Sequence, residues 1–155
     1  FLDFNVLDNF IENINIAGSI FSKANKVLCY HNHALEFQKI NNEIILERIY
    51  NNTDKIYIQG EPDVYWIQKG GHDPINWCKK LKNRLPLIHL KDFIMLNEHE
   101  SYYAEIGNGN LDIKNIIKEA ELSGCKWYIV EQDECQGDPF ISIETSFNNL
   151  LEFVT

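Results

Sequence analysis

Four apolar segments that read as β-strands alternate with helical patterns, and this alternation constrains the fold more than any other feature of the sequence. The strand-like segments are residues 26–33, 55–66, 84–93 and 126–133. The helical patterns cover residues 8–21, 43–51, 74–82, 112–122 and 144–153. The strand-like segments are rich in Ile, Val, Leu and aromatic residues without strict polar alternation, which is typical of parallel strands buried on both faces. The sequence therefore predicts an α/β fold in which helices cover parallel strands.

Residues that begin and end helices support these boundaries. Pro74 stands in the first turn of one helical pattern, Asp112 is placed to cap another, and Gly124 follows its end. A doubly wound sheet and a closed barrel both fit the alternation, but a doubly wound nucleotide fold normally has a glycine-rich turn after its first strand. No such turn follows residues 29–33, and no Pro/Gly/Ser-rich linker divides the chain. We therefore expect one domain over residues 1–155.

The charge balance and the cysteines limit the partners and the compartment. The 155 residues carry 14 Lys and Arg against 23 Asp and Glu, a net charge of −9 that gives no general attraction to phosphate backbones or anionic lipid. The apolar runs are too short to span a bilayer, and no basic region precedes an apolar one at the N-terminus. The four cysteines have no CxxC spacing. We expect neither nucleic acid nor a membrane as partner, and a cytoplasmic location.

Polar side chains appear where each of the four strand-like segments ends. These residues are His31, His33, Asp63, His89, Lys91, Glu131 and Asp133. Because side chains alternate faces along a strand, residues two positions apart point to the same side. The carboxyl ends of parallel strands lie at one edge of a sheet, where α/β barrels and open α/β sheets place their active sites. The sequence therefore predicts that these seven side chains converge.

Each of these residues also has a purely structural interpretation. A single histidine at a strand end is more often part of a rim than a ligand, Asp63 after Pro62 is suited to begin a turn, and Lys91 with Asp92 is suited to form an exposed pair. For the structural interpretations to be correct, a separate one would have to hold at each of the four strand ends. One shared site at which all four strand ends meet is a simpler explanation. Carboxylates and imidazoles without thiolates suit Mn²⁺, Mg²⁺, Zn²⁺ or Co²⁺, and the carboxylates favour Mn²⁺ or Mg²⁺. The charge of such a cation would also offset the cost of burying acids.

Two glycine-containing stretches lie near these strand ends. They are residues 69–74, KGGHDP, and residues 106–110, IGNGN. Both would allow the backbone to approach a substrate closely, but ordinary turns use the same residues. Both interpretations stay open at this point.

Five motifs in order along the chain resemble a known family. They are YHNHALEF, PDVYWIQKGGHDP, LPLIHLKDF, AEIGNGNLD and WYIVEQD. Together they resemble the sugar phosphate isomerase/epimerase family of xylose isomerase-like TIM barrels, relatives of inosose dehydratase and of tagatose 3-epimerase-type enzymes. The likeness covers nearly the whole chain, and no single motif is decisive, whereas five in sequence are specific.

The resemblance implies a divalent metal ion, most often manganese, held by ligands from the last four strands of the barrel. Asp63, His89 and Glu131 match the metal ligands of the sixth, seventh and eighth strands. The fifth strand departs from the pattern, because many relatives have a metal-binding Glu where this chain has His31. Either His31 takes that place or Glu36 reaches in, and we place Glu36 in the ligand set.

The resemblance also implies an activity, proton transfer next to a carbonyl of a sugar or keto-sugar. We expect an isomerase or epimerase. A dehydratase of the inosose type or a 3-keto-glycoside lyase is the alternative. Glu131 would combine ligation with proton transfer, His33 and His31 would act as acid and base, and Lys91 would hold a substrate oxygen. Trp66 stands where several epimerases have a substrate-contacting His, so a stacking wall and core packing are equal alternatives.

The same resemblance places this chain in the second half of the barrel, strands five to eight. A complete barrel takes about 250 residues, and this sequence begins at Phe1 rather than Met. Four strands cannot close a barrel, and two open edges invite another chain. We therefore expect either a missing N-terminal half or association of two half-barrels. Two other functions are alternatives. Endonuclease IV shares this ancestry, but it needs a basic surface to bind DNA, and the acidic balance of this chain opposes that function. An inactive, truncated sugar-binding relative would bind no stoichiometric cation, so metal content separates it from an enzyme.

Overall fold

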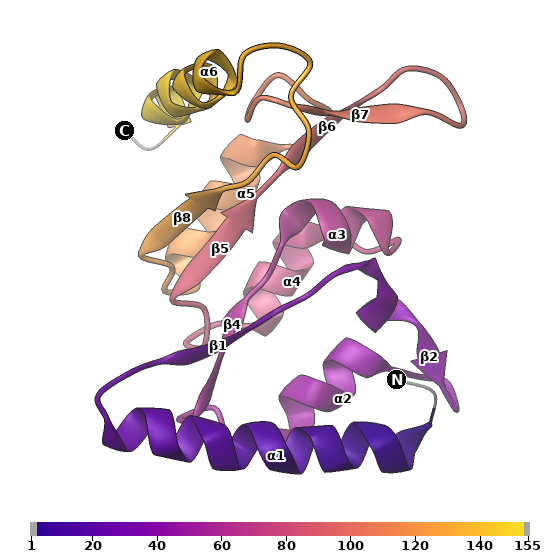
Figure 1. The fold of residues 1–155 in the computed structure, drawn as a ribbon, viewed down its shortest axis with the longest axis vertical. Coiled ribbons are helices and arrows are strands. Elements are labelled where there is room, and N and C mark those ends of the chain that lie inside the picture. Colours follow the sequence, from indigo (N-terminus) through magenta and orange to yellow (C-terminus); the bar gives the residue numbers. More distant parts are fainter. Residues whose placement is uncertain (1–2, 154–155) are drawn as a thin grey trace.

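The computed structural model describes residues 3–153 of the chain, and its helices and strands alternate (Figure 1). The helices are α1 (Phe4–Lys23), α2 (Ile45–Asn52), α3 (Val64–Lys69), α4 (Pro74–Lys80), α5 (Ile113–Leu122) and α6 (Pro139–Phe153), with a 3₁₀ turn η1 (Ala34–Phe37). The strands are β1 (Leu28–His31), β2 (Lys39–Ile40), β3 (Glu43–Ile44), β4 (Ile58–Glu61), β5 (Leu87–Leu90), β6 (Asp92–Met95), β7 (Ser101–Ala104) and β8 (Trp127–Val130).

Four of these strands run parallel and form the centre of the fold. Strand β1 pairs with β4, with His31 opposite Glu61. Strand β5 pairs with β8, with His89 opposite Ile129. A parallel bridge between Asp63 and His89 joins the two pairs. The order β1–β4–β5–β8, with helices in the connections, confirms the predicted α/β class and is that of half a TIM barrel.

The structure corrects the predicted extent of several elements. Residues 55–66 were predicted to be extended, but β4 covers only Ile58–Glu61, and α3 already begins at Val64. The strand ends there because Pro62 cannot donate a ladder hydrogen bond and Asp63 caps the helix, accepting from the Trp66 N–H. Helix α6 begins at Pro139, five residues before the predicted start, and α1 extends beyond its predicted range at both ends.

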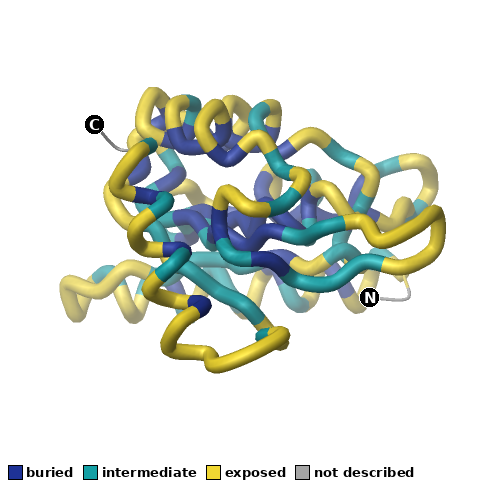
Figure 2. Tube along the Cα trace, turned by 90° about the horizontal axis from the view of Figure 1, so that it is seen from above, coloured by how far each residue is buried: buried dark blue, intermediate teal, exposed yellow. Residues whose placement is uncertain are grey.

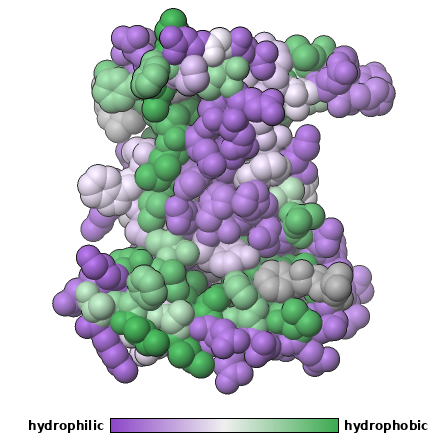
Figure 3. Space-filling view, in the orientation of Figure 1, coloured by the Kyte–Doolittle hydropathy of each residue, from purple (hydrophilic) through white to green (hydrophobic). Residues whose placement is uncertain are grey.

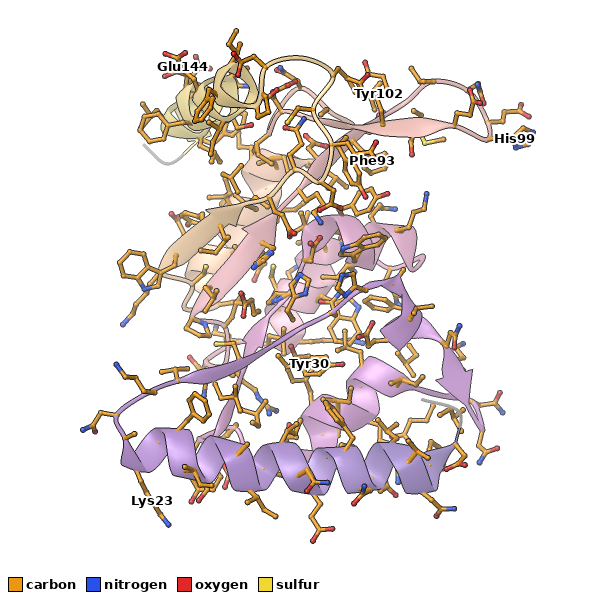
Figure 4. The ribbon with its side chains drawn as sticks, in the orientation of Figure 1. Lys23, Tyr30, Phe93, His99, Tyr102 and Glu144 are labelled. Carbon is orange, nitrogen blue, oxygen red and sulfur yellow. The ribbon has the colours of Figure 1, made fainter. Side chains whose placement is uncertain are left out.

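Two antiparallel hairpins were not predicted. The β2–β3 hairpin turns through Asn41 and Asn42, both of which have positive φ, a conformation that asparagine tolerates better than most residues. The β6–β7 hairpin splits the segment 84–93, because the chain leaves the parallel sheet after Leu90 and β6 pairs with β7 instead. This second hairpin extends away from the parallel strands, with His99 near its tip (Figure 4).

The main core lies between the parallel strands and helices α3 to α5. Ile88 and Leu90 are fully buried there in one cluster with Ile116 and Ile117 of α5, whereas Leu87 and His89, which alternate with them, face the other side of the sheet and are only partly buried. Figure 2 shows the buried trace in the interior and the exposed trace on the outer turns of the helices. A smaller core joins α1 to α2, and Tyr30 of β1 points toward these two helices (Figure 4).

No helix among residues 3–153 is long and apolar enough to cross a membrane. The four cysteines are free thiols. Burial raises the pKa of Cys78 to about 12, so this side chain stays a neutral, apolar part of the core.

Candidate metal centre

Four side chains from four separate segments meet at one edge of the parallel sheet. They are His31, Asp63, His89 and Glu131, and one potential ligand atom from each lies within 4.8 Å of all the others. His31 ends β1 and His89 lies in β5, while Asp63 stands two residues after the end of β4 and Glu131 directly follows β8. The shared strand direction places all four on the carboxyl-terminal edge. The predicted convergence is thus present in the structure for these four residues.

His89 is held between two carboxylates. Its Nδ1 lies 2.8 Å from Glu131 Oε2, and its Nε2 lies 2.8 Å from Glu61 Oε1. Sequence reasoning missed Glu61. A signal was present, because Glu61 stands two positions before Asp63 at the end of a strand, and it faces the same side as His31, its neighbour in the register. His31 contributes the second imidazole, with its Nε2 3.4 Å from Asp63 Oδ2.

Lys91 lies inside this group of acids and is only 1% exposed. Its Nζ lies 3.1 Å from Asp133 Oδ1, 3.3 Å from Glu131 Oε2 and 3.6 Å from Asp63 Oδ2. Burial is the largest single influence on the pKa of Lys91 and lowers it, but the surrounding carboxylates together raise the pKa above its ordinary value. Lys91 is therefore a buried ammonium, and its interpretation as part of an exposed pair with Asp92 is wrong.

The arrangement lowers the pKa values of Glu131 and Asp133 and raises the pKa of His31. Burial is the largest influence on the pKa of Glu131 and raises it, but His89 and Lys91 outweigh burial and lower the pKa. The pKa of Asp133 is lowered in the same way, by Tyr103 and Lys91 against burial. The pKa of His31 is raised, first by its hydrogen bond to Asp63. Near neutral pH the Glu131 and Asp133 carboxylates are therefore ionised beside the Lys91 ammonium.

Glu36, which was placed in the ligand set from the sequence, lies outside the group. Its Oε1 accepts a hydrogen bond from the Tyr30 hydroxyl at 3.1 Å, and its Oε2 accepts from the His33 N–H at 3.0 Å, which closes the start of η1. His31 occupies the corresponding place among the four convergent side chains. The local capping bond uses the Glu36 carboxylate that would otherwise be free to bind a cation.

His33 and Trp66 form an aromatic wall beside the group. The ring of His33 lies 5.0 Å from that of His31 and 5.2 Å from that of Trp66. The Lys91 Nζ lies 5.3 Å from the centre of the Trp66 ring, which is close enough for a cation–π interaction. Among the described residues the buried Trp66 Nε1 has no hydrogen-bond partner. Trp66 thus contacts the site rather than the core on the helical side of the sheet.

Asp92 points away from the site and organises the second glycine stretch. Its two carboxylate oxygens accept hydrogen bonds from the backbone N–H groups of Phe93, Gly107, Gly109 and Leu111. A Cβ on Gly109 would lie only 2.1 Å from Asp92 Oδ1, so glycine is required there. Residues 106–110 therefore wrap a carboxylate of their own chain. The first stretch is a turn, in which Gly70 ends α3 and Asp73 caps α4.

The donor set fits a divalent cation. Two imidazoles and two carboxylates without a thiolate suit Mn²⁺, Zn²⁺ or Co²⁺, and a cation would compensate the fully buried Asp63 carboxylate. His89 is already oriented by Glu61, which lies outside the four residues, as in metal sites where a neighbouring acid sets the imidazole.

Comparison with known proteins gives the same fold. No family model matches the sequence. Inosose dehydratase from Clostridium tetani is 26% identical over 145 residues, covering 81% of this chain and 47% of that protein. A sugar phosphate isomerase/epimerase structure from Parabacteroides distasonis is 31% identical with a TM-score of 0.83, covering 97% of this chain and 53% of the other.

A more distant structure supports the fold alone. The xylose isomerase domain protein from Planctomyces limnophilus matches 94% of this chain and 51% of its own, with a TM-score of 0.71 at 12% identity. In each comparison this chain spans about half the length of its relative. The chain therefore has the fold of about half a TIM barrel and is similar to a sugar phosphate isomerase/epimerase and to inosose dehydratase.

Proposed function

We propose that this half-barrel carries the metal centre of a sugar or keto-sugar isomerase or epimerase that moves a proton next to a carbonyl. The convergence of His31, Asp63, His89 and Glu131 supports this proposal most directly. The names of the similar proteins, sugar phosphate isomerase/epimerase and inosose dehydratase, support the substrate class.

The four convergent side chains would hold the cation, most often manganese, with His31 rather than Glu36 as the fourth ligand. When bound, the cation supplies Lewis-acid stabilisation of negative charge that develops on substrate oxygens. Glu131 would take the proton, because it is the most accessible acid of the group and its lowered pKa keeps it ionised. Lys91 would orient Glu131 and Asp63 and hold a substrate oxygen.

His33 and Trp66, which form the aromatic wall, would shape the substrate site. His33 lies at the rim beside His31, where it can donate or accept a proton from the substrate. Trp66 would stack on a sugar ring, and its unpartnered Nε1 would donate to a sugar hydroxyl. These contacts bind and orient the substrate and exclude water from the proton transfer.

Dehydration is the second candidate, favoured by the relative named inosose dehydratase. It begins with the same proton abstraction and differs in the departure of a β-hydroxyl group. A panel of keto-sugars and keto-inositols in D₂O separates the two activities by NMR. An isomerase or epimerase incorporates deuterium with retention of all oxygens, whereas a dehydratase yields an unsaturated ketone.

Metal content tests the centre without requiring turnover. After chelation and reloading with Mn²⁺, the chain should hold one ion, and His89→Ala and Glu131→Gln should each lose it because they remove ligands. Glu36→Gln is the matched control and should keep the ion. Full occupancy in both ligand variants would contradict the proposal, and absence of a stoichiometric ion from the parent chain would favour the inactive sugar-binding alternative.

A further inference from the structure

The β6–β7 hairpin turns one of its faces toward the convergent side chains. Phe93 of β6 lies opposite Tyr103 of β7, so their side chains share a face of the hairpin. Both rings contact that of Tyr65 in α3, with ring centres 5.4 Å and 5.2 Å apart. Tyr102 points to the other face, and Figure 4 marks it and Phe93 on the hairpin. Tyr103 reaches the site, because its ring centre lies 5.7 Å from the Lys91 Nζ.

Tyr103 holds the carboxylate of Asp133. Asp133 lies in the irregular segment between β8 and α6, and its side chain is 37% exposed. Hydrophilic residues cover the middle of the face shown in Figure 3, where this segment runs in Figure 1. The Tyr103 hydroxyl is hydrogen-bonded to Asp133 and to Tyr65. Because an ionised carboxylate only accepts, Tyr103 donates to Asp133 and accepts from Tyr65. The hairpin and α3 therefore fix a carboxylate that its own segment would leave mobile.

Asp133 is the nearest acid to the Lys91 ammonium. Both of its oxygens accept hydrogen bonds from the Lys91 Nζ at 3.1 Å. The same Nζ lies farther from Glu131 Oε2, at 3.3 Å, and from Asp63 Oδ2, at 3.6 Å. Glu131 and Asp63 belong to the four convergent side chains, whereas Asp133 does not. The ammonium therefore lies closest to the one acid of the three that is not a candidate metal ligand.

The position of Lys91 matters because an ammonium and a metal ion compete for the same carboxylate oxygens. Lys91 is 1% exposed and carries three N–H donors, so it cannot satisfy them with bulk water. If Asp133 released the ammonium, its remaining acidic partners at this distance would be Glu131 and Asp63. A closer ion pair with either acid would occupy an oxygen that the cation needs.

We infer that Asp133, held in place by Tyr103, is a positioning residue that keeps the Lys91 ammonium from pairing closely with Glu131 and Asp63 and so leaves those carboxylates to the cation. The inference rests on the proposed metal centre and adds to it two residues that do not touch the ion. If Asp133 only neutralised the buried ammonium, the effect of its removal on metal affinity would not depend on Lys91.

A double-mutant cycle on Mn²⁺ affinity tests this dependence. Asp133→Asn should weaken Mn²⁺ binding at least about tenfold in the parent chain, because Lys91 then pairs with Glu131 and Asp63. In the Lys91→Met background the same change should weaken binding less than about threefold, because no ammonium competes. Loss of the charge at position 133 acts in both backgrounds, so the cycle removes it. Glu134→Gln is the matched control, since it removes one charge from the next, exposed residue, and it should change the affinity less than about threefold.

A second measurement uses the metal-free protein and does not need Lys91→Met to fold. The NMR signal of the buried Lys91 ammonium should shift in Tyr103→Phe, which removes the donor to Asp133, and stay in place in Tyr102→Phe, on the other face of the hairpin.

The outcomes separate this inference from the proposed function. Equal effects of Asp133→Asn in both backgrounds, in a chain that binds Mn²⁺, would overturn the inference and leave the proposed metal centre intact. An unchanged Lys91 signal in Tyr103→Phe would overturn the role of Tyr103. A parent chain that binds no Mn²⁺ would contradict the proposed function, and the inference with it.

Discussion

At the scale of single residues, the site depends on which way neighbouring side chains point. Lys91 and Asp92 are adjacent in sequence, but Lys91 enters the group of acids while Asp92 turns to the loop at 106–110. Alternation along a strand predicts this divergence. It does not predict the partners of Asp92, because the N–H donors of Gly107, Gly109 and Leu111 lie 15 to 19 residues away in the chain.

Replacing Lys91 with Met should destabilise the metal-free protein by about 3–5 kcal/mol, because it leaves the buried Asp63 carboxylate without its ammonium partner. The lowered pKa values of Glu131 and Asp133 contribute stability that is present above their ordinary values of 4.5 and 3.8 and is lost as the pH falls through the lower folded values. When the midpoint of urea unfolding is measured against pH, Lys91→Met should make its fall at acid pH less steep. Lys79→Met, at a more exposed ion pair, is the control and should leave the profile unchanged.

Replacing Asp92 with Asn should loosen the loop at 106–110. The amide NH₂ would face N–H donors where a carboxylate oxygen now accepts two of them, at a cost of about 1–3 kcal/mol. Hydrogen exchange at Gly107 and Gly109 should accelerate accordingly. Asp112→Asn is the matched control, because asparagine caps a helix as well as aspartate does. Unchanged exchange at both glycines would contradict the assigned role of Asp92.

At the scale of elements, helix and strand types follow the sequence patterns, while their ends follow tertiary contacts. Apolar residues stand on both sides of Pro62 in the segment 55–66, so periodicity alone does not separate β4 from α3; the Asp63 cap does. Asp63 also shows that a structural and a functional interpretation can hold together, since its Oδ1 caps α3 while its Oδ2 faces His31 and Lys91.

Helix α1 offers a test in which packing opposes helix propensity. Gly18 is buried, and a Cβ there would lie 2.7 Å from the Tyr57 carbonyl oxygen and 2.8 Å from Ile58 Cδ1. Gly18→Ala should therefore destabilise the protein by about 1–3 kcal/mol, although alanine in a free helix gains about 1 kcal/mol over glycine. Ser19→Ala, one position along, should change stability little. Thermal unfolding of the two variants checks the sign, and a stabilised Gly18→Ala protein would contradict this packing.

At the scale of the whole molecule, four parallel strands gather ligands at one edge and leave both sides of the sheet open. The proposed metal centre needs only the strands present here, because all four convergent side chains come from β1, β5 and the residues that follow β4 and β8. The barrel interior needs further strands, because Trp127 and, among the described residues, the outer edges of β1 and β8 are uncovered.

Metal binding should therefore stabilise the half-barrel as a unit. Mn²⁺ at about one hundred times its Kd should add about 2.7 kcal/mol to the free energy of unfolding, which raises Tm by about 5–10 °C for a chain of this size. His31→Ala should lose this rise and Glu36→Gln should keep it. Thermal scans with Mn²⁺ and with excess chelator measure the difference. A retained rise in His31→Ala would exclude His31 as a ligand.

The sequence alone determined the α/β class, the parallel strands and the strand-end residues that share an edge. These features depend on local periodicity, which a strand or helix expresses wherever it is placed. The tertiary structure decided which of those residues meet. Glu61 joins His89, Glu36 is used by Tyr30 and the start of η1, and Asp92 is used by a distant loop. It also left the apolar faces of α1 and α6 exposed, because the surface that covers a helix is a property of its neighbours and not of its own sequence.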